Sequence, residues 1–194
     1  MKRTRNAVRN VIFGGLLKGY QILVPFIMRT LLIRYLGMEY LGLNSLFTSI
    51  LQILNLAELG VGSALGYSMY APIAEGKKDE ICALLSLYRR YYRLIGLGIF
   101  LAGIVLLPFL PYLIKGGEGI EHITLIYMIY VLGSASSYLL SYKNSIYQAY
   151  QKGYICAGWS MACECIKTVS QITVLLLTRN FILYLAVQQA IQFL

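Results

Sequence analysis

Several long apolar segments of this chain carry a narrow stripe of polar residues, repeated at three- or four-residue spacing. In the clearest case, a segment rich in Leu, Ile, Val and Phe carries Lys18, Gln21, Pro25 and Arg29. At 3.6 residues per turn, these side chains share one sector of roughly 80° on a helix. The segment is long enough to cross a bilayer, where a charged side chain must face protein or water rather than lipid. The pattern therefore predicts a membrane helix with one wet side.

The apolar segments together predict an all-α, polytopic transmembrane bundle of about six helices. Pro25 is expected to kink the first helix, and Pro108 and Pro111 to end or bend the third. The last apolar run reaches residue 194 after about 15 positions, fewer than the ~20 that a span needs. We therefore expect one transmembrane domain, residues 1–194, truncated within its sixth helix. The expected helices are about 11–35, 42–73, 88–114, 121–142, 154–178 and 180–194.

The composition agrees with a membrane protein of several spans. Mean hydropathy is +0.66, 58% of the residues are hydrophobic and only 13% are charged. A soluble domain usually has about a quarter charged residues. The basic start precedes an apolar run that is too long for a signal peptide and shows no small-residue cleavage site, so we expect a retained first helix. The four cysteines form no disulfide framework and are expected to act as small apolar residues.

Basic residues predict which side of the membrane each connection faces. Eleven Lys and Arg residues fall on the side of the N-terminus and three on the other, so the N-terminus is expected to be cytoplasmic. The net charge of +9 then needs no nucleic acid partner, because most of it is positive-inside charge, with attraction to anionic lipid headgroups in addition. Tyrosines near this interface are expected to form an aromatic belt. They are Tyr88, Tyr91, Tyr92, Tyr142, Tyr147, Tyr150 and Tyr154.

Further polar stripes lie on the second, fifth and sixth expected helices. Each charge at membrane depth costs about 2.5–3.5 kcal/mol on insertion scales, so these residues are expected to share a polar cavity or to pair. Glu164 and Lys167, at i and i+3, are suited to pair with each other. Glu58 is suited to pair with Lys18 or Arg29. The stripes add Asn44, Thr48, Gln52, Asn55, Glu58, Gly62 and Gly66 to the second helix, Ser160, Glu164, Lys167, Thr168 and Gln171 to the fifth, and Tyr184, Gln188 and Gln192 to the sixth. The fourth helix carries a milder stripe of Ser134, Ser137 and Ser141.

The charges at membrane depth leave the expected cavity cationic. Three cations against two anions give a net charge of +1, among hydroxyl and amide side chains. Such a cavity suits a hydroxylated anion, for example a sugar chain on a phosphate or diphosphate, because Lys and Arg form charge-assisted hydrogen bonds with phosphate oxygens. Catalytic motifs for phosphate loops, zinc proteases and serine hydrolases are absent from the sequence. We therefore expect no enzyme, no cofactor and no metal site.

One long stretch carries a family resemblance. The run MRTLLIRYLGMEYLGLNSLFTSILQILNLAELGVGSALGYSMYAPIAEGKKDEI resembles the N-terminal part of bacterial polysaccharide flippases. The similar elements are Arg29 ahead of Tyr35-Leu36-Gly37, then Tyr40-Leu41-Gly42-Leu43, Glu58-Leu59-Gly60-Val61-Gly62, and Tyr70 to Ile81. Residues 147–154, YQAYQKGY, resemble the family's fourth cytoplasmic-side connection. These flippases belong to the multidrug/oligosaccharidyl-lipid/polysaccharide exporter superfamily and export repeat units of O-antigen, capsule or teichoic acid.

The resemblance implies the N-terminal lobe of a two-lobed, MATE-like transporter of the bacterial cytoplasmic membrane. Relatives move polyprenyl-diphosphate-linked oligosaccharide to the outer leaflet for polysaccharide biosynthesis by alternating access. The implied partners are this lipid-linked substrate, the bilayer, a missing C-terminal lobe and polysaccharide polymerase and assembly proteins. Substrate contacts are expected at Lys18, Gln21, Arg29, Gln52, Asn55, Lys167 and Gln171. Glu58 and Glu164 are expected to couple transport to an ion gradient or to act as counter-charges.

Two alternative functions fit the same sequence. A multidrug or cation exporter of the superfamily should have a more acidic and aromatic cavity with unpaired carboxylates. A non-transporting scaffold of a polysaccharide assembly complex would bind partners and move nothing. Resistance to lipophilic cations would indicate the first alternative, and pull-down of partners without transport activity would indicate the second.

Overall fold

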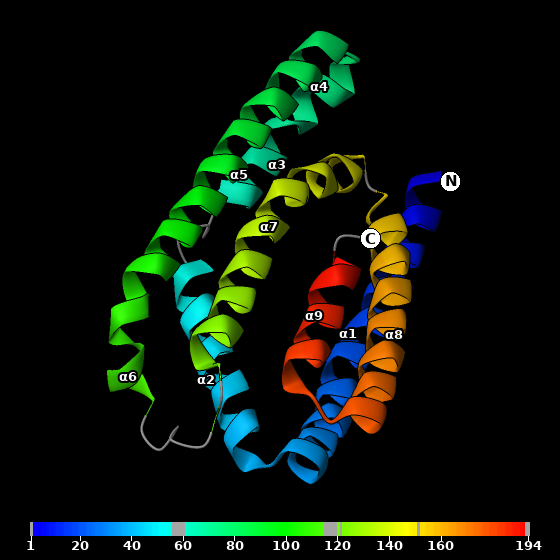
Figure 1. Cartoon of the computed structure of the whole chain (residues 1–194). Helices are drawn as coiled ribbons and strands as arrows, with labels where there is room; N and C mark the ends of the chain where they lie inside the picture. Colours follow the sequence, from blue (N-terminus) through cyan, green and yellow to red (C-terminus); the bar gives the residue numbers. More distant parts are fainter. Residues whose placement is uncertain (1, 56–60, 115–119, 121, 151, 193–194) are drawn as a thin grey trace.

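A computed structural model describes residues 2–55, 61–114, 120, 122–150 and 152–192, and in these ranges the chain is helical, with turns between the helices and no strand (Figure 1). The helices pack lengthwise into an elongated bundle. Their bounds are α1 Lys2–Leu36, α2 Met38–Asn55, α3 Val61–Ser68, α4 Tyr70–Glu75, α5 Lys78–Leu106, the 3₁₀ turn η2 Leu107–Phe109, α6 Leu110–Leu113, α7 Ile123–Ala149, α8 Gly153–Thr178 and α9 Phe181–Gln192.

Three stretches of these helices are long and apolar enough to cross a membrane. They are Val8–Leu36, Lys78–Leu113 and Gly153–Thr178, of 29, 36 and 26 residues. In their most apolar parts only 6%, 22% and 11% of the residues are buried within the bundle. Most of their apolar surface therefore faces outward, as contact with lipid requires. Two shorter apolar helical stretches, Ile123–Leu139 and Phe181–Ile191, accompany them.

The expectation of one long helix over 42–73 was wrong. Gly37 ends α1 with φ of +99°, and its backbone N–H donates to the carbonyls of Leu32 and Ile33, so α2 already begins at Met38. Helix α2 ends at Asn55, and α3 and α4 follow as separate short helices. Met69, the residue between α3 and α4, is fully buried. Residues 56–60, with Glu58 among them, lie outside the described residues.

The third expected helix, 88–114, begins ten residues too late. In the structure α5 starts at Lys78, directly after Gly76 ends α4 with φ of +70°. Asp79 and Glu80 stand in the first turn, where their charge favours the helix N-terminus. At the other end, the segment around Pro108 is a 3₁₀ turn that leads into α6, as expected of a proline there. Helix α1, in contrast, continues through Pro25.

The last three helices keep closer to their expected bounds. Helix α7 continues to Ala149, seven residues beyond the expected end. Helices α8 and α9 begin and end within a residue or two of the expected positions.

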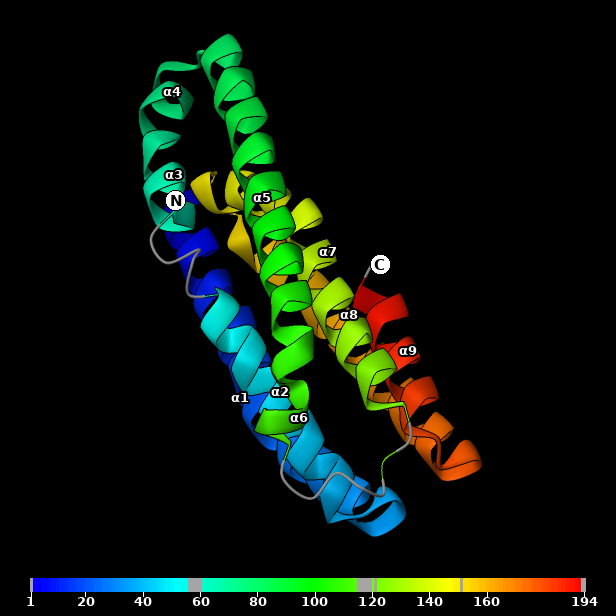
Figure 2. The same cartoon turned by 60° about the vertical axis from the view of Figure 1, so that its left-hand side comes forward.

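Two apolar clusters hold the bundle together. The larger one joins α1, α2, α7 and α9, with Phe47 and Tyr127 fully buried and their ring centroids 5.2 Å apart. The smaller one joins α5 and α7 to the segment around Met69, and it buries Tyr88 and Tyr92. These two tyrosines therefore pack inside the protein and do not form the expected aromatic belt. Helices α5 and α7 pack along much of their length (Figure 2), and the ring of Tyr92 stacks on that of Tyr138 of α7 with centroids 6.3 Å apart. The Tyr88 hydroxyl is hydrogen-bonded to that of Ser68 at the end of α3.

Basic residues gather at one end of the bundle. The start of α1, the starts of α5 and α8, and the end of α7 all lie at the upper end of Figure 1. Described basic residues near this end are Arg9, Lys77, Lys78, Arg89, Arg90, Arg93 and Lys152. Arg34, in the last turn of α1, and Arg179, directly after α8, lie at the opposite end. The fold thus separates the basic residues along the bundle axis.

Candidate functional site

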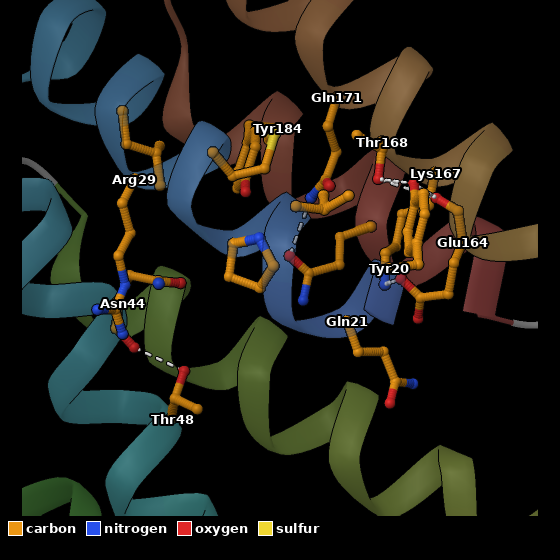
Figure 3. Close-up of a pocket in the computed structure, with 15 residues that line it drawn as sticks. Tyr20, Gln21, Arg29, Asn44, Thr48, Glu164, Lys167, Thr168, Gln171 and Tyr184 are labelled. Atoms are coloured by element: carbon orange, nitrogen blue, oxygen red, sulfur yellow. Dashed lines mark hydrogen bonds and ion pairs between the residues drawn. The ribbon is translucent and has the colours of Figure 1, made fainter. Parts of the chain in front are cut away.

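A polar cavity of about 300 Å³ lies between α1, α2, α8 and α9 (Figure 3). Its apolar wall comes from Val24, Pro25, Met28 and Leu32 of α1. The remaining lining is polar on every helix that contributes, so the stripes of four helices do converge on one space. The polar lining residues are Tyr20, Gln21, Arg29, Asn44, Thr48, Glu164, Lys167, Thr168, Gln171, Tyr184 and Gln188.

The cavity brings together four of the seven residues that the sequence assigned to substrate contact. These are Gln21, Arg29, Lys167 and Gln171, and Glu164 lies with them. Figure 3 shows Arg29 on the α2 side and the Glu164–Lys167 pair on the α8 side, with the cavity between them. The first helix and the fifth expected helix therefore do contribute one shared polar site, although they are far apart in sequence.

Three predicted contacts lie elsewhere. Lys18 and Gln52 are exposed and do not line the cavity. Lys18 lies three residues before Gln21 and Gln52 four residues after Thr48, so each is about one helical turn from the nearest lining residue of its own stripe. Asn55 accepts a hydrogen bond from the Ser134 hydroxyl over 3.2 Å, which ties α2 to α7. Helical spacing placed these side chains on the correct face, but their depth along the bundle excludes them from the cavity.

Glu164 and Lys167 neutralise each other. Their carboxylate oxygen and ammonium nitrogen are 2.5 Å apart, and the two side chains are 33% and 25% exposed. The pairing hypothesis from their i, i+3 spacing is therefore confirmed. As a result, Lys167 offers the cavity less free positive charge than its position in the sequence suggested.

Arg29 supplies the uncompensated charge of the cavity. Its side chain is exposed, and among the described residues no carboxylate lies within ion-pair distance of it. Its proposed partner Glu58 lies outside the described residues. With Glu164 and Lys167 paired, the described lining carries a net charge of +1, centred on the Arg29 guanidinium. A guanidinium presents several N–H donors in a fixed plane, which suits phosphate or carboxylate oxygens.

Tyr20 is a cavity residue that the stripe analysis missed. Its hydroxyl donates to the Thr168 hydroxyl over 2.8 Å and approaches the Glu164 carbonyl oxygen at 3.1 Å. These bonds join α1 to α8 at the edge of the cavity. A tyrosine in an apolar membrane segment looks like an ordinary lipid-facing aromatic residue, so only its neighbour Gln21 gave a signal in the sequence.

Gln171 serves as a structural tie as well as a lining residue. It is 4% exposed, and its side-chain amide donates to the Gln188 side-chain carbonyl over 3.1 Å. On the facing side, the Tyr130 hydroxyl donates to the side-chain oxygen of Asn44, which holds α7 against α2. Hydrogen bonds between polar side chains commonly join neighbouring membrane helices. The cavity walls are therefore held by polar contacts between helices.

Comparisons with protein-family models, with curated proteins and with solved structures found no match to this chain. What the fold and the site define is a class, a helical membrane protein with a cationic, amide- and hydroxyl-lined cavity between four helices. In the described part of the chain, no group of three or more His, Cys, Asp or Glu residues comes together as a metal site.

Proposed function

We propose that this chain is the N-terminal lobe of a flippase that moves polyprenyl-diphosphate-linked oligosaccharide across the bacterial cytoplasmic membrane. The observation that carries the proposal is the Arg29 guanidinium, a cation without a described counter-charge, beside amide and hydroxyl groups in a cavity between membrane helices. At membrane depth such a charge must face protein, water or a ligand rather than lipid. An anionic ligand that carries hydroxyl groups meets both the charge and the polar lining.

The cavity residues divide into an anion-binding part and a sugar-binding part. Arg29 would donate charge-assisted hydrogen bonds to diphosphate oxygens, which are stronger than bonds between neutral groups. Gln21, Asn44 and Thr48 also line the cavity and would bind sugar hydroxyls. The paired Glu164 and Lys167 would bound the site on α8 without adding net charge.

The size of the cavity supports a lobe of a larger transporter. A volume of about 300 Å³ is at the lower end of ligand pockets, enough for a diphosphate with its first sugar but not for an oligosaccharide. In a two-lobed, MATE-like protein, the space opposite α1 and α2 would be completed by the other lobe. The six expected helices correspond in this proposal to α1, α2, α5, α7, α8 and α9, with α3 and α4 as an appendage to α5.

The distribution of charge supports a cytoplasmic N-terminus. The end of the bundle that holds Arg9, Lys77 and Lys152 also holds the arginines of α5, whereas Arg34 and Arg179 are at the other end. Lys and Arg are enriched on the cytoplasmic side of membrane proteins. We therefore orient the chain with the start of α1 in the cytoplasm.

Export of surface polysaccharide tests the proposal. In cells that depend on this gene for export, Arg29→Ala should reduce surface polysaccharide at least about tenfold, because a lost charge-assisted bond to phosphate is worth ~1.5–3 kcal/mol. Arg34→Ala is the matched control, since Arg34 is an exposed arginine of the same helix outside the cavity. Normal export by Arg29→Ala, at equal protein level, would show that the site assignment is wrong.

The drug or cation exporter is the weaker candidate. Such a cavity needs a free carboxylate to attract a cation, and the one carboxylate among the described lining residues, Glu164, is paired with Lys167. Cells that carry Arg29→Ala should therefore show unchanged resistance to lipophilic cations. A gain or loss of resistance in that variant would favour the exporter over the flippase.

A further inference from the structure

The span that begins with α5 is longer than a membrane is thick. Lys78–Leu113 has 36 residues, about 54 Å at 1.5 Å per residue, against ~30 Å of hydrocarbon. The uncharged part runs from Leu94 to Ile114, about 20 residues, which alone matches the hydrocarbon thickness. The first four turns of α5, before Leu94, therefore extend about 20 Å out of the membrane.

This extension is a folded helical hairpin with its own apolar core. Helix α4 lies along the start of α5, and Figure 2 shows both reaching beyond the other helices. Met69 and Tyr88 are fully buried between them, and the Tyr88 and Ser68 hydroxyls are hydrogen-bonded at 3.0 Å. At the tip, Lys77 pairs with Glu75 at 2.7 Å and with Glu80 at 3.1 Å. These contacts hold the hairpin together, and α5 continues from it as one helix to Leu106.

Three arginines stand where the hairpin meets the membrane. Arg90 and Arg93 lie on the same helical face as Leu94, Leu97 and Leu101, which are 64%, 54% and 53% exposed. Arg89 is exposed beside them. The opposite face of α5 packs against the protein through Tyr88 and Tyr92. Along this outward face of α5, the exposed residues thus change from leucine to arginine within one turn.

Arg89, Arg90 and Arg93 have no protein counter-charge in the described part of the chain. The ion pairs there involve Lys77 and Lys167, and none involves these arginines. Their positive charge therefore faces outward at the depth where phospholipid phosphates lie. Long basic side chains at such a depth extend their charged ends toward the headgroups.

We propose that Arg89, Arg90 and Arg93 form a binding site for the headgroups of anionic phospholipids, which fixes the depth of α5 and holds the hairpin on the membrane surface. The exposed Tyr91 lies among them and would insert its ring at the same level, as interfacial tyrosines do. This proposal concerns lipid around the protein and is independent of the transported substrate.

Native mass spectrometry of the purified chain, titrated with phosphatidylglycerol or with phosphatidylcholine of the same acyl chains, tests the proposal. A basic residue near an anionic surface contributes about fivefold to binding, so R89Q/R90Q/R93Q should weaken retention of phosphatidylglycerol about 100-fold. The charge-conserving variant R89K/R90K/R93K should retain it. The matched control K77Q/K78Q removes two charges from the same hairpin, about 20 Å farther from the membrane. This distance exceeds the ~10 Å over which salt leaves a charge unscreened, so the control should bind phosphatidylglycerol as the wild type does.

The proposal is overturned if R89Q/R90Q/R93Q, with helix content unchanged by circular dichroism, retains phosphatidylglycerol as well as the wild type. Equal loss by K77Q/K78Q overturns it too, because binding would then follow total charge and not this site. If the triple glutamine variant does not fold, the single variants R89Q, R90Q and R93Q decide. Each should weaken retention of phosphatidylglycerol about fivefold, and unchanged retention in all three refutes the site.

Discussion

Gly103 allows α5 and α7 to pack closely, and a single methyl group there should separate them. A Cβ atom at this position would lie 2.5 Å and 2.9 Å from the two methyl carbons of Val131. Carbon atoms in contact prefer ~3.5–4.0 Å, so the overlap is about 1 Å. Val131 is fully buried and belongs to the larger apolar cluster, which leaves its methyl groups little room to move. Gly103→Ala should therefore destabilise the protein by about 1–3 kcal/mol, the usual cost of overpacking.

Gly98 provides a control of opposite sign on the same helix. It is exposed, and nothing lies within 4 Å of a Cβ added there. Gly98→Ala should therefore stabilise the protein by about 0.5–1 kcal/mol, because alanine favours the helix over glycine. The assay is unfolding in mixed detergent micelles with rising SDS, followed by far-ultraviolet circular dichroism.

The double variant Gly103→Ala/Val131→Ala separates packing from other causes. It removes both methyl carbons that the new Cβ would meet, so adding Val131→Ala to Gly103→Ala should cost less than Val131→Ala costs alone. If Gly103→Ala is as stable as Gly98→Ala, α5 and α7 are not in close contact at Gly103 and Val131.

Two further predictions concern single polar side chains. Tyr20→Phe removes the hydroxyl that donates to Thr168 and approaches the Glu164 carbonyl. It should lower the free energy of unfolding by about 1 kcal/mol in the same SDS assay. An unchanged unfolding midpoint would show that these bonds do not join α1 to α8. Hydrogen bonds to Glu75 and Glu80 raise the pKa of Lys77 in the folded hairpin. The protonated Lys77 therefore stabilises the fold fully at pH values below the pKa of lysine in the unfolded chain. This stabilisation is lost as pH rises through the higher pKa of the folded state. The thermal midpoint should therefore fall above about pH 10.5 more steeply in the wild type than in Lys77→Met, and equal slopes would contradict the assignment.

The helical membrane class and the polar face of each helix could be predicted from the sequence alone. The helical period of 3.6 residues and the length of an apolar run are local properties of the sequence. They predicted the bounds of α8 and α9, and the i, i+3 spacing predicted the pairing of Glu164 with Lys167. The early start of α5 was also readable, since Gly76 followed by Asp79 and Glu80 is a typical end and start of helices.

Which polar residues meet depends on how the helices pack against one another. Periodicity gives the angle of a side chain around its helix but not the height at which two helices align. Gln21 and Arg29 therefore share a cavity with Gln171, whereas Lys18, on the same stripe, lies outside it. Burial of Tyr88 depends in the same way on the approach of α4 and α7 to α5, which no local pattern contains. The polar stripes can therefore be predicted from the sequence, but the cavity cannot, because the alignment of the helices depends on the contacts among all of them.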